Sequence, residues 1–247
     1  MEKFRGIVFY RKKFHDDDLL IKVLTDIYGK KTFFLKRGRK TRNRLSYGLQ
    51  AFTIGEYIGK ISDKSFSFIN EVITEKIYQK IYQDIEKSAY VQYIFSLYDS
   101  AFEDSKPIAN WFQLLECSLD AIENNADTPT LTHAFELKLL NVFGVNLDFF
   151  SCQICQRRDL PLDLSFKYDG MICMNHFEKD RYRFHLTSRI VRCIQVLKIG
   201  SVKSIAKMQI DPKNMKTLDF ICNQIYSNYV GIYPKTKSFI DKLHRSS

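Results

Sequence analysis

Four side chains that commonly bind metals occur as two short pairs near the middle of the chain. Cys152 and Cys155 form a C-x2-C pair, and Cys173 and His176 form a C-x2-H pair after 17 intervening residues. Three thiolates and one imidazole make a closed tetrahedral set that suits one structural zinc ion. Asp169-Gly170, between the pairs, predicts a hairpin turn that would bring them together. Buried free cysteines beside a surface histidine are the alternative interpretation.

A catalytic zinc site is a weaker interpretation of the same residues. His176 begins an H-x-E sequence, which in zinc deaminases precedes P-C-x-x-C. Here the order is reversed, Ser151 stands where the proline would be, and four protein ligands leave no open position for water. The chain also has no P-loop, no G-x-G-x-x-G and no G-x-S-x-G sequence. We therefore expect no enzymatic activity.

A second cluster of functional side chains is basic. The segment 36–44 has six cations in nine residues, and two lysines precede it at the start of the same predicted strand. Glycine and polar spacers fit a loop that contacts phosphates without reading base sequence, although a solvated charge run is the alternative. The residues that we expect to bind nucleic acid are Lys30, Lys31, Phe34, Lys36, Arg37, Arg39, Lys40, Arg42 and Arg44.

Phe34 belongs to this set because of strand alternation. Phe33 and Leu35 are expected in the interior, whereas Phe34 shares its face with Lys36. It could therefore stack on a base, or it could pack against a helical domain, and the sequence does not separate these alternatives. The basic segment 11–13 could extend the same track.

Charge is sorted along the chain. Residues 1–80 have 18 Lys/Arg against 9 Asp/Glu, residues 81–151 have 3 against 11, and residues 152–247 have 17 against 8. Two basic blocks around an acidic one favour one surface for a polyanion and another that avoids it. Nucleic acid is the first candidate partner, and a membrane surface is the second.

The elements that must position these residues differ between the two ends of the chain. The first eighty residues contain five short runs rich in β-formers, typical of a small barrel of the OB type, although an SH3-like barrel has similar spacing. The strands are expected at 4–12, 19–25, 31–36, 50–58 and 66–73.

Helical periodicity then replaces strand alternation on both sides of the cysteine-bearing segment. Tyr90, Ile94, Leu97 and Ala101 mark one helix face, and Asp211-Pro212 opens a later helix. We expect the helices to pack together and the cysteine segment to be an insertion. The predicted domains are 1–79 (OB fold), 80–150 (helical), 151–185 (zinc-binding insertion) and 186–247 (C-terminal helices).

Two compartments are disfavoured by composition. No apolar run approaches the roughly 18 residues of a membrane span. The N-terminal residues lack a long apolar stretch after their charges, so a secretory signal is not expected. We expect a cytoplasmic protein whose six cysteines are reduced thiols or metal ligands.

With these parts in place, the chain resembles the bacterial recombination mediator family RecO. The order and spacing of several short segments carry the resemblance, since none is specific alone. These segments are Gly6-Ile7-Val8, the run 18–25, Tyr28-Gly29-Lys30, Lys36–Arg39, Leu49–Thr53, Phe135–Leu140 with Gly144, and the elements at Gly231, Pro234-Lys235 and Ser238-Phe239. His176 departs from the usual zinc-bearing pattern of the family, which has a fourth cysteine there.

The resemblance implies an α+β fold, in which an N-terminal OB-type β-barrel is followed by a mainly helical domain with an inserted zinc-binding subdomain. It also implies a non-enzymatic, nucleoid-associated mediator that binds single- and double-stranded DNA and anneals complementary strands. Its implied partners are RecR and the C-terminal tail of single-strand-binding protein, with which it helps to load RecA. His133 and Lys138 are the local cations that could meet such an acidic tail. The alternatives are an RNA- or ribosome-binding OB module with zinc and a zinc-dependent enzyme of nucleic acids.

Overall fold

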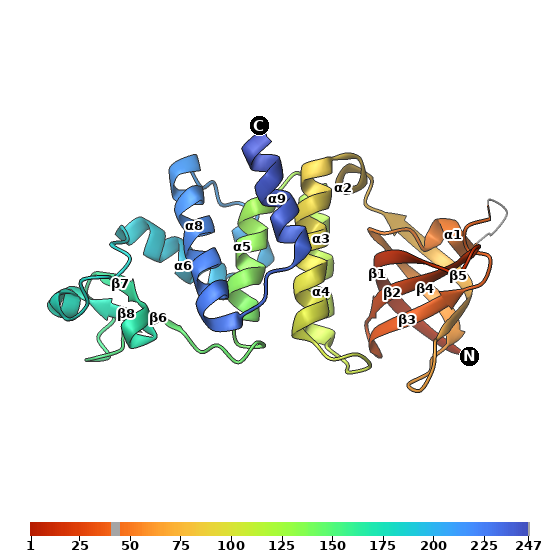
Figure 1. Ribbon diagram of the computed structural model, residues 1–247, viewed down its shortest axis with the longest axis horizontal. Coiled ribbons are helices and arrows are strands. Elements are labelled where there is room, and N and C mark those ends of the chain that lie inside the picture. The colour runs from red at the N-terminus through yellow and green to blue at the C-terminus, as the bar shows by residue number, and fades with distance from the viewer. Residues whose placement is uncertain (41–44, 247) are drawn as a thin grey trace. The chain divides into compact units, whose positions relative to one another are not determined.

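The computed structural model describes residues 1–40 and 45–246 and divides into two compact units (Figure 1). The first unit comprises residues 1–126 and the C-terminal segment from Lys235, and the second comprises residues 127–234. The sequence pattern predicts domains that each consist of one continuous stretch of the chain. In the structure, the C-terminal helix from Lys235 instead belongs to the first unit.

A five-stranded antiparallel sheet forms the N-terminal part of the first unit. Its strand order is β3-β2-β1-β4-β5, so the first three strands form a meander and β4 pairs with the free edge of β1. The strands are β1 (Glu2–Phe14), β2 (Asp18–Thr25), β3 (Gly29–Leu35), β4 (Thr53–Lys60) and β5 (Phe68–Ile77).

The β2–β3 connection illustrates how local chemistry sets the register of the sheet. The Thr25 hydroxyl donates to the Gly29 carbonyl at 2.8 Å and accepts from the Tyr28 backbone N–H at 2.9 Å. Gly29 adopts a φ of +66°, and a Cβ there would lie 2.1 Å from the Lys106 carbonyl oxygen. Only glycine fits this turn, which pairs Thr25 with Gly29 and fixes every later pair of the two strands.

The interior of the sheet is apolar, but the sheet is not a closed barrel. Phe33 and Leu35 are buried at 1% and 5% exposure, as the alternation predicts. Among the described residues, the backbone hydrogen bonds between the two edges of the sheet are limited to Ser67, just before β5, which donates to Thr32 and accepts from Phe34. The predicted closed barrel is therefore wrong, because one isolated bridge cannot replace the continuous ladder of hydrogen bonds that full closure requires.

Helices complete the first unit. Tyr90, Ile94 and Leu97 are buried in α3, which confirms the predicted apolar face. Phe9 of β1 stacks on Phe95 of the same helix at a ring separation of 4.4 Å, which joins the sheet to the helices. The helices of this unit are α1 (Leu45–Gly48), α2 (Gln79–Gln83), α3 (Ile85–Ala101), α4 (Ala109–Glu123) and α9 (Lys235–Ser246).

The second unit combines helices with a three-stranded sheet of order β6-β8-β7. Asp127 and Asp211 cap α5 and α8, and a proline lies in the first turn of each helix, as the sequence predicts for α8. Its helices are α5 (Thr128–Leu139), α6 (Ser188–Ile199), α7 (Val202–Ile205) and α8 (Pro212–Ile225). Its strands are β6 (Asp148–Cys152), β7 (Leu162–Ser165) and β8 (Gly170–Cys173). The shorter helical turns are η1 (Phe166–Tyr168), η2 (Met174–Lys179) and η3 (Tyr226–Val230).

Across the described ranges 1–40 and 45–246, no helix has both the length and the apolar character needed to cross a membrane.

Candidate nucleic-acid interface and metal centre

The basic loop after β3 is anchored through its backbone. The Arg37 N–H donates to the Asp18 carboxylate at 2.7 Å, and the Arg39 N–H donates to the Asp17 carbonyl at 2.9 Å. Gly38 packs on the core, since a Cβ there would lie 2.9 Å from Leu19. The acidic turn between β1 and β2 therefore holds the beginning of the loop.

The loop side chains that the structure describes lie at the surface. Lys36, Arg37, Arg39 and Lys40 are all exposed. Arg39 donates to the Asp16 carbonyl, and Lys40 lies 3.2 Å from the Asp17 carboxylate in a pair that is about half exposed on both sides. Such surface pairs are weak and exchange readily with other anions. The remaining predicted loop residues, Arg42 and Arg44, lie outside the described residues.

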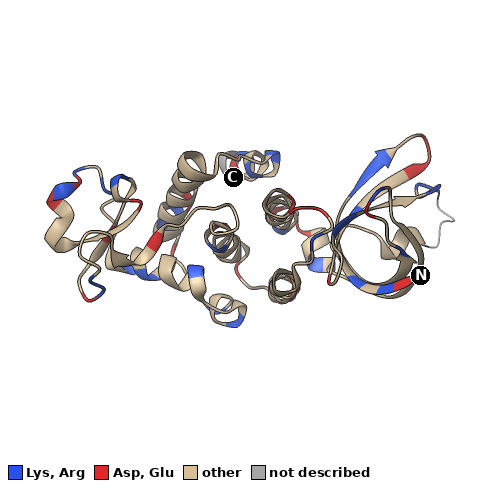
Figure 2. Ribbon diagram, turned by 90° about the horizontal axis from the view of Figure 1, so that it is seen from below, with Lys and Arg blue, Asp and Glu red and all other residues tan. Residues whose placement is uncertain are grey.

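Lys30 and Lys31 are corrections to the predicted phosphate-binding set. The Lys30 side chain is 2% exposed, and its ammonium donates to the carboxylate and the carbonyl of Asp99. The Lys31 side chain is 4% exposed and pairs with Asp63 while donating to Ser105. Both ammonium groups have partners within the protein and almost no exposed surface, so the structure gives no support to phosphate binding by either. Figure 2 shows Lys and Arg (blue) and Asp and Glu (red) interspersed over this unit.

Phe34 lies in a cluster of aromatic rings at the surface of the sheet. Its ring stacks on Phe66 at 6.1 Å, and it makes edge contacts with Phe14 at 6.0 Å and Phe68 at 5.9 Å. Phe66 and Phe68 remain 39% and 42% exposed. These partners belong to β1, β5 and the loop before β5, so they favour a surface position over packing against helices. We call Phe14, Phe34, Phe66 and Phe68 the aromatic cluster.

Strand register adds a cation to this face. Lys12 lies opposite Leu20, and Leu20 lies opposite Phe34. Directly opposed residues share a face of the sheet, so exposed Lys12 flanks the aromatic cluster on the side of β1. Sequence analysis missed the other three rings. The alternating pair Phe66 and Phe68 was the available signal.

The predicted metal ligands come together at one end of the small sheet. Cys152 ends β6, Cys173 ends β8, and His176 lies in η2. The β7–β8 hairpin turns through Asp169, which has a φ of +48°, and Gly170 follows it, as the sequence predicts. This hairpin places the second pair of ligands beside the first.

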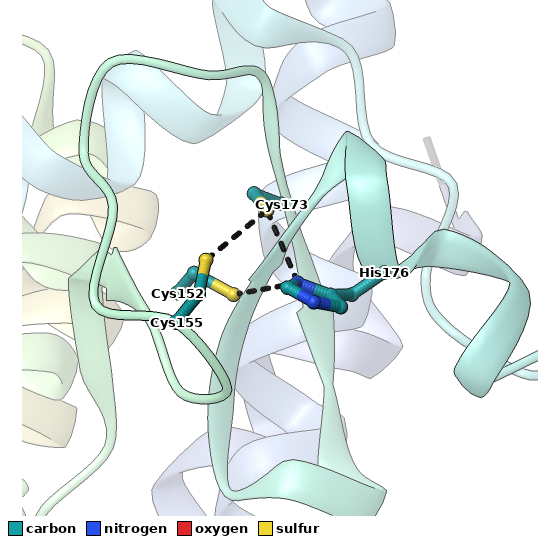
Figure 3. Close-up of side chains that lie close together, drawn as sticks. All are labelled: Cys152, Cys155, Cys173 and His176. Carbon is teal, nitrogen blue, oxygen red and sulfur yellow. Dashed lines mark hydrogen bonds between the residues drawn. The ribbon is translucent and has the colours of Figure 1, made fainter.

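The separations within the quartet fit one metal ion. The ligand atoms of Cys152, Cys155, Cys173 and His176 all lie within 4.8 Å of one another. His176 Nδ1 lies 3.5 Å from the Cys152 sulfur and 3.3 Å from the Cys173 sulfur, and the sulfurs of Cys155 and Cys173 are 3.7 Å apart (Figure 3). Ligands at 2.0–2.3 Å around a tetrahedral ion are separated by about 3.3–3.8 Å.

The backbone prepares one of these thiols for binding. Burial raises the pKa of Cys152, but backbone N–H groups of Cys155, Ile154 and Cys173 donate to its sulfur and lower the pKa below its ordinary value. Burial raises the pKa of the Cys173 thiol, to which the nearby sulfurs of Cys152 and Cys155 add. The site therefore favours a first thiolate strongly, whereas further deprotonation requires a cation.

Comparisons with known proteins cover nearly the whole chain. Residues 1–78 match the family model described as Recombination protein O N terminal, and residues 82–238 match Recombination protein O C terminal. The DNA repair protein RecO of Latilactobacillus sakei is 37% identical over 243 residues, which are 98% of this chain and 89% of that protein. Its counterpart in Streptococcus suis is 35% identical over 239 residues, which are 97% and 91% of the two chains. The chain belongs to the RecO family.

This RecO-family chain has a buried ion-pair network that sequence analysis missed. Lys22, 8% exposed, donates to both oxygens of Asp104 at 2.7 and 2.8 Å, and it lies 3.4 Å from Asp99. Asp99 lies in the last turn of α3, where the helix dipole disfavours a carboxylate, so Lys22 and Lys30 offset that cost. The signal was a single lysine within the otherwise apolar part of β2.

The two cations considered for an acidic tail are both engaged within the RecO C-terminal region. His133 is 1% exposed. The half-buried Lys138 ammonium donates to the carbonyls of Lys198 and Gly200 at 3.1 and 2.9 Å. The structure therefore lends no support to a peptide-binding role for this pair.

Proposed function

We propose that this chain is a non-enzymatic DNA repair and recombination mediator. In this proposal it binds single- and double-stranded DNA, anneals complementary strands and, with RecR, helps to load RecA on strands coated by single-strand-binding protein. Membership of the RecO family supports the repair role, since its relatives are named DNA repair protein RecO. The nucleic-acid-binding part is proposed to be residues 1–79.

The observation that carries the proposal is the exposed basic loop that begins two residues after Phe34 of the aromatic cluster. Lys36, Arg37, Arg39 and Lys40 offer cations to the backbone phosphates, and Phe66 and Phe68 offer ring surface to bases. Cations along a track beside stacking rings are typical of proteins that bind single strands without sequence preference. Neutralised phosphates on two strands repel each other less, and annealing is then favoured.

We propose zinc as the ion of the Cys152, Cys155, Cys173 and His176 quartet. Three thiolates and one imidazole fill a tetrahedral shell, so the ion would act as a structural cross-link between β6, β8 and η2. The quartet then fixes the fold of residues 148–180 and takes no part in chemistry on DNA.

The central test is charge reversal of the basic loop. A variant with Arg37, Arg39, Arg42 and Arg44 changed to Glu should lose single-strand binding and annealing while its circular dichroism stays unchanged. Fluorescence-monitored annealing of complementary oligonucleotides coated with single-strand-binding protein measures the expected loss of annealing. The control is Lys80→Glu with Lys106→Glu, which changes two exposed lysines of the same unit away from the loop.

Two results would contradict the proposal. Annealing that survives loop reversal removes the loop from the mechanism. A competition in which structured RNA displaces single-stranded DNA at lower concentration than DNA itself favours the RNA-binding alternative.

A further inference from the structure

A second cluster of metal-binding side chains lies between α5 and α8, which pack against each other in the second unit (Figure 1). His133 and Glu136 are three residues apart on α5, and Asp219 and Cys222 are three residues apart on α8. Residues three apart share one face of a helix. Each helix therefore contributes one pair to the same interface.

The ligand atoms of this cluster are close together. Those of His133, Glu136 and Cys222 all lie within 4.8 Å of one another. His133 Nδ1 lies 2.6 Å from the Glu136 carboxylate, and His133 Nε2 lies 3.2 Å from the Asp219 carboxylate. The last distance is close to the separation of about 3.3 Å expected for two ligands on one tetrahedral ion.

Burial makes this cluster unusual. His133, Glu136 and Cys222 are each about 1% exposed. Acidic side chains are almost never fully buried unless they are paired or serve a metal ion. The contact between Glu136 and His133 Nδ1 satisfies one ring nitrogen, whereas among the described residues Nε2 has the Asp219 carboxylate within 3.2 Å but no hydrogen bond of good geometry.

The contact of Glu136 with the imidazole resembles the outer shell of known metal sites. A metal-bound histidine usually donates its second N–H to a carboxylate, which fixes the tautomer and the orientation of the ring. Here Glu136 holds Nδ1 and Nε2 faces the Asp219 carboxylate, so a metal ion would take the place of a proton between Nε2 and Asp219. Glu136 is then the positioning residue, and Nε2 is the ligand.

We propose that His133 Nε2, Asp219 and Cys222 bind a second divalent ion of the zinc class, distinct from the ion of the Cys152 quartet. Nitrogen, oxygen and thiolate donors together suit a borderline-soft divalent ion. The Asp219 side chain is 30% exposed, so a route for the ion from solvent exists on the side of α8. The bound ion would tie α5 to α8.

Metal stoichiometry of the full-length protein tests this proposal. Reduced, metal-stripped protein is titrated with Zn2+ against a chromogenic chelator, and Co2+ is added separately to observe thiolate-to-metal absorption. We expect two ions per chain in the parent protein and one in both Cys222→Ser and His133→Gln. The matched control is Cys117→Ser, which removes an exposed thiol of α4 and should keep two.

A second background separates this site from excess binding at the quartet. A variant with Cys152, Cys155 and Cys173 all changed to Ser, which leaves the quartet no thiolate, should still bind one ion with Co2+–thiolate absorption, and the further change Cys222→Ser should remove that absorption. Circular dichroism and the first equivalent of bound metal verify that Cys222→Ser remains folded. A single ion in the parent, or two ions in folded Cys222→Ser, means that the cluster is only a buried hydrogen-bonding network, and the proposal is then wrong.

Discussion

The cations of the N-terminal sheet form two groups with opposite roles. Lys22, Lys30 and Lys31 are buried and contact carboxylates, whereas Lys36 and Arg37, a few residues further along the same chain, are exposed. Each of these cations adds the same single charge to the net charge, whichever group it belongs to. The second group offers its charge at the surface, where a polyanion can reach it, because the first group is buried.

This difference arises because acidic residues of the helical part form ion pairs with some lysines of the sheet. Asp99 and Asp104, at and just beyond the end of α3, belong to the acidic block of the chain and contact Lys22 and Lys30. The acidic block therefore has a structural role inside the first unit, in addition to any role in avoiding DNA. The ion pairs separate the cations that stabilise the fold from the cations that can bind a ligand.

Removal of a buried cation should give the largest effect on stability. Lys30→Met leaves Asp99 with one fewer partner in a desolvated position, and we expect the free energy of unfolding to fall by about 2 kcal/mol. The expected loss is below that of a fully buried pair, because the Asp99 side chain is 32% exposed. Urea unfolding measures it. The salt dependence of DNA binding by the folded protein should not change, and a clear change would return Lys30 to the phosphate-binding set.

Loss of a surface ring should affect binding and leave stability nearly unchanged. Phe66→Ala removes a 39% exposed ring of the aromatic cluster, and the expected loss in single-strand affinity is about 1 kcal/mol. Duplex DNA should be affected less, because its bases are already stacked. The control is Tyr182→Ala, which removes a 96% exposed ring elsewhere. Equal losses for single strands and duplex would mean that the cluster does not stack on bases.

Much of this architecture could be predicted from residue patterns. Strand alternation placed Phe33 and Leu35 in the interior, and C-x2-C with C-x2-H identified a quartet whose ligand atoms converge. These features depend on local spacing, which the sequence displays directly. The contacts of Lys30 with Asp99 join residues 69 apart, and no local pattern encodes that distance.

The second metal-binding cluster illustrates the same limit. His133 and Cys222 come from helices separated by the whole cysteine-bearing segment, and each alone resembles an ordinary helical residue. The sequence displays each pair three residues apart, but only packing of α5 on α8 brings the pairs together. The incomplete closure of the sheet also depends on a long-range contact, the isolated bridge between Phe33 and Ser67.

Single substitutions in the loop should give a smaller effect than loop reversal. Arg39→Gln removes one exposed cation, and the slope of log K against log salt on single strands should become shallower by about 0.7 if the side chain contacts one phosphate. The free energy of unfolding should change by less than about 0.5 kcal/mol, as is usual at the surface. Fluorescence anisotropy over a salt series measures the slope. An unchanged slope would mean that Arg39 makes no phosphate contact.

Acid should reduce the contribution of the buried cations and leave that of the loop nearly unchanged. Burial raises the pKa of Asp104, but the hydrogen bond from Lys22 outweighs this effect and holds the pKa below its ordinary value. A depressed carboxyl pKa stabilises the folded state above the ordinary pKa of Asp, and this stabilisation is lost as the pH falls through the lowered value. The difference in unfolding free energy between the parent and Lys22→Met should therefore be largest at neutral pH and should shrink below about pH 4.

Urea unfolding of both proteins at several pH values measures the difference, with Lys36→Met as the exposed control. A difference that stays constant down to pH 3 would show that the ionised Asp104 carboxylate does not carry the effect of Lys22, and the comparison of the two groups would then rest on burial alone.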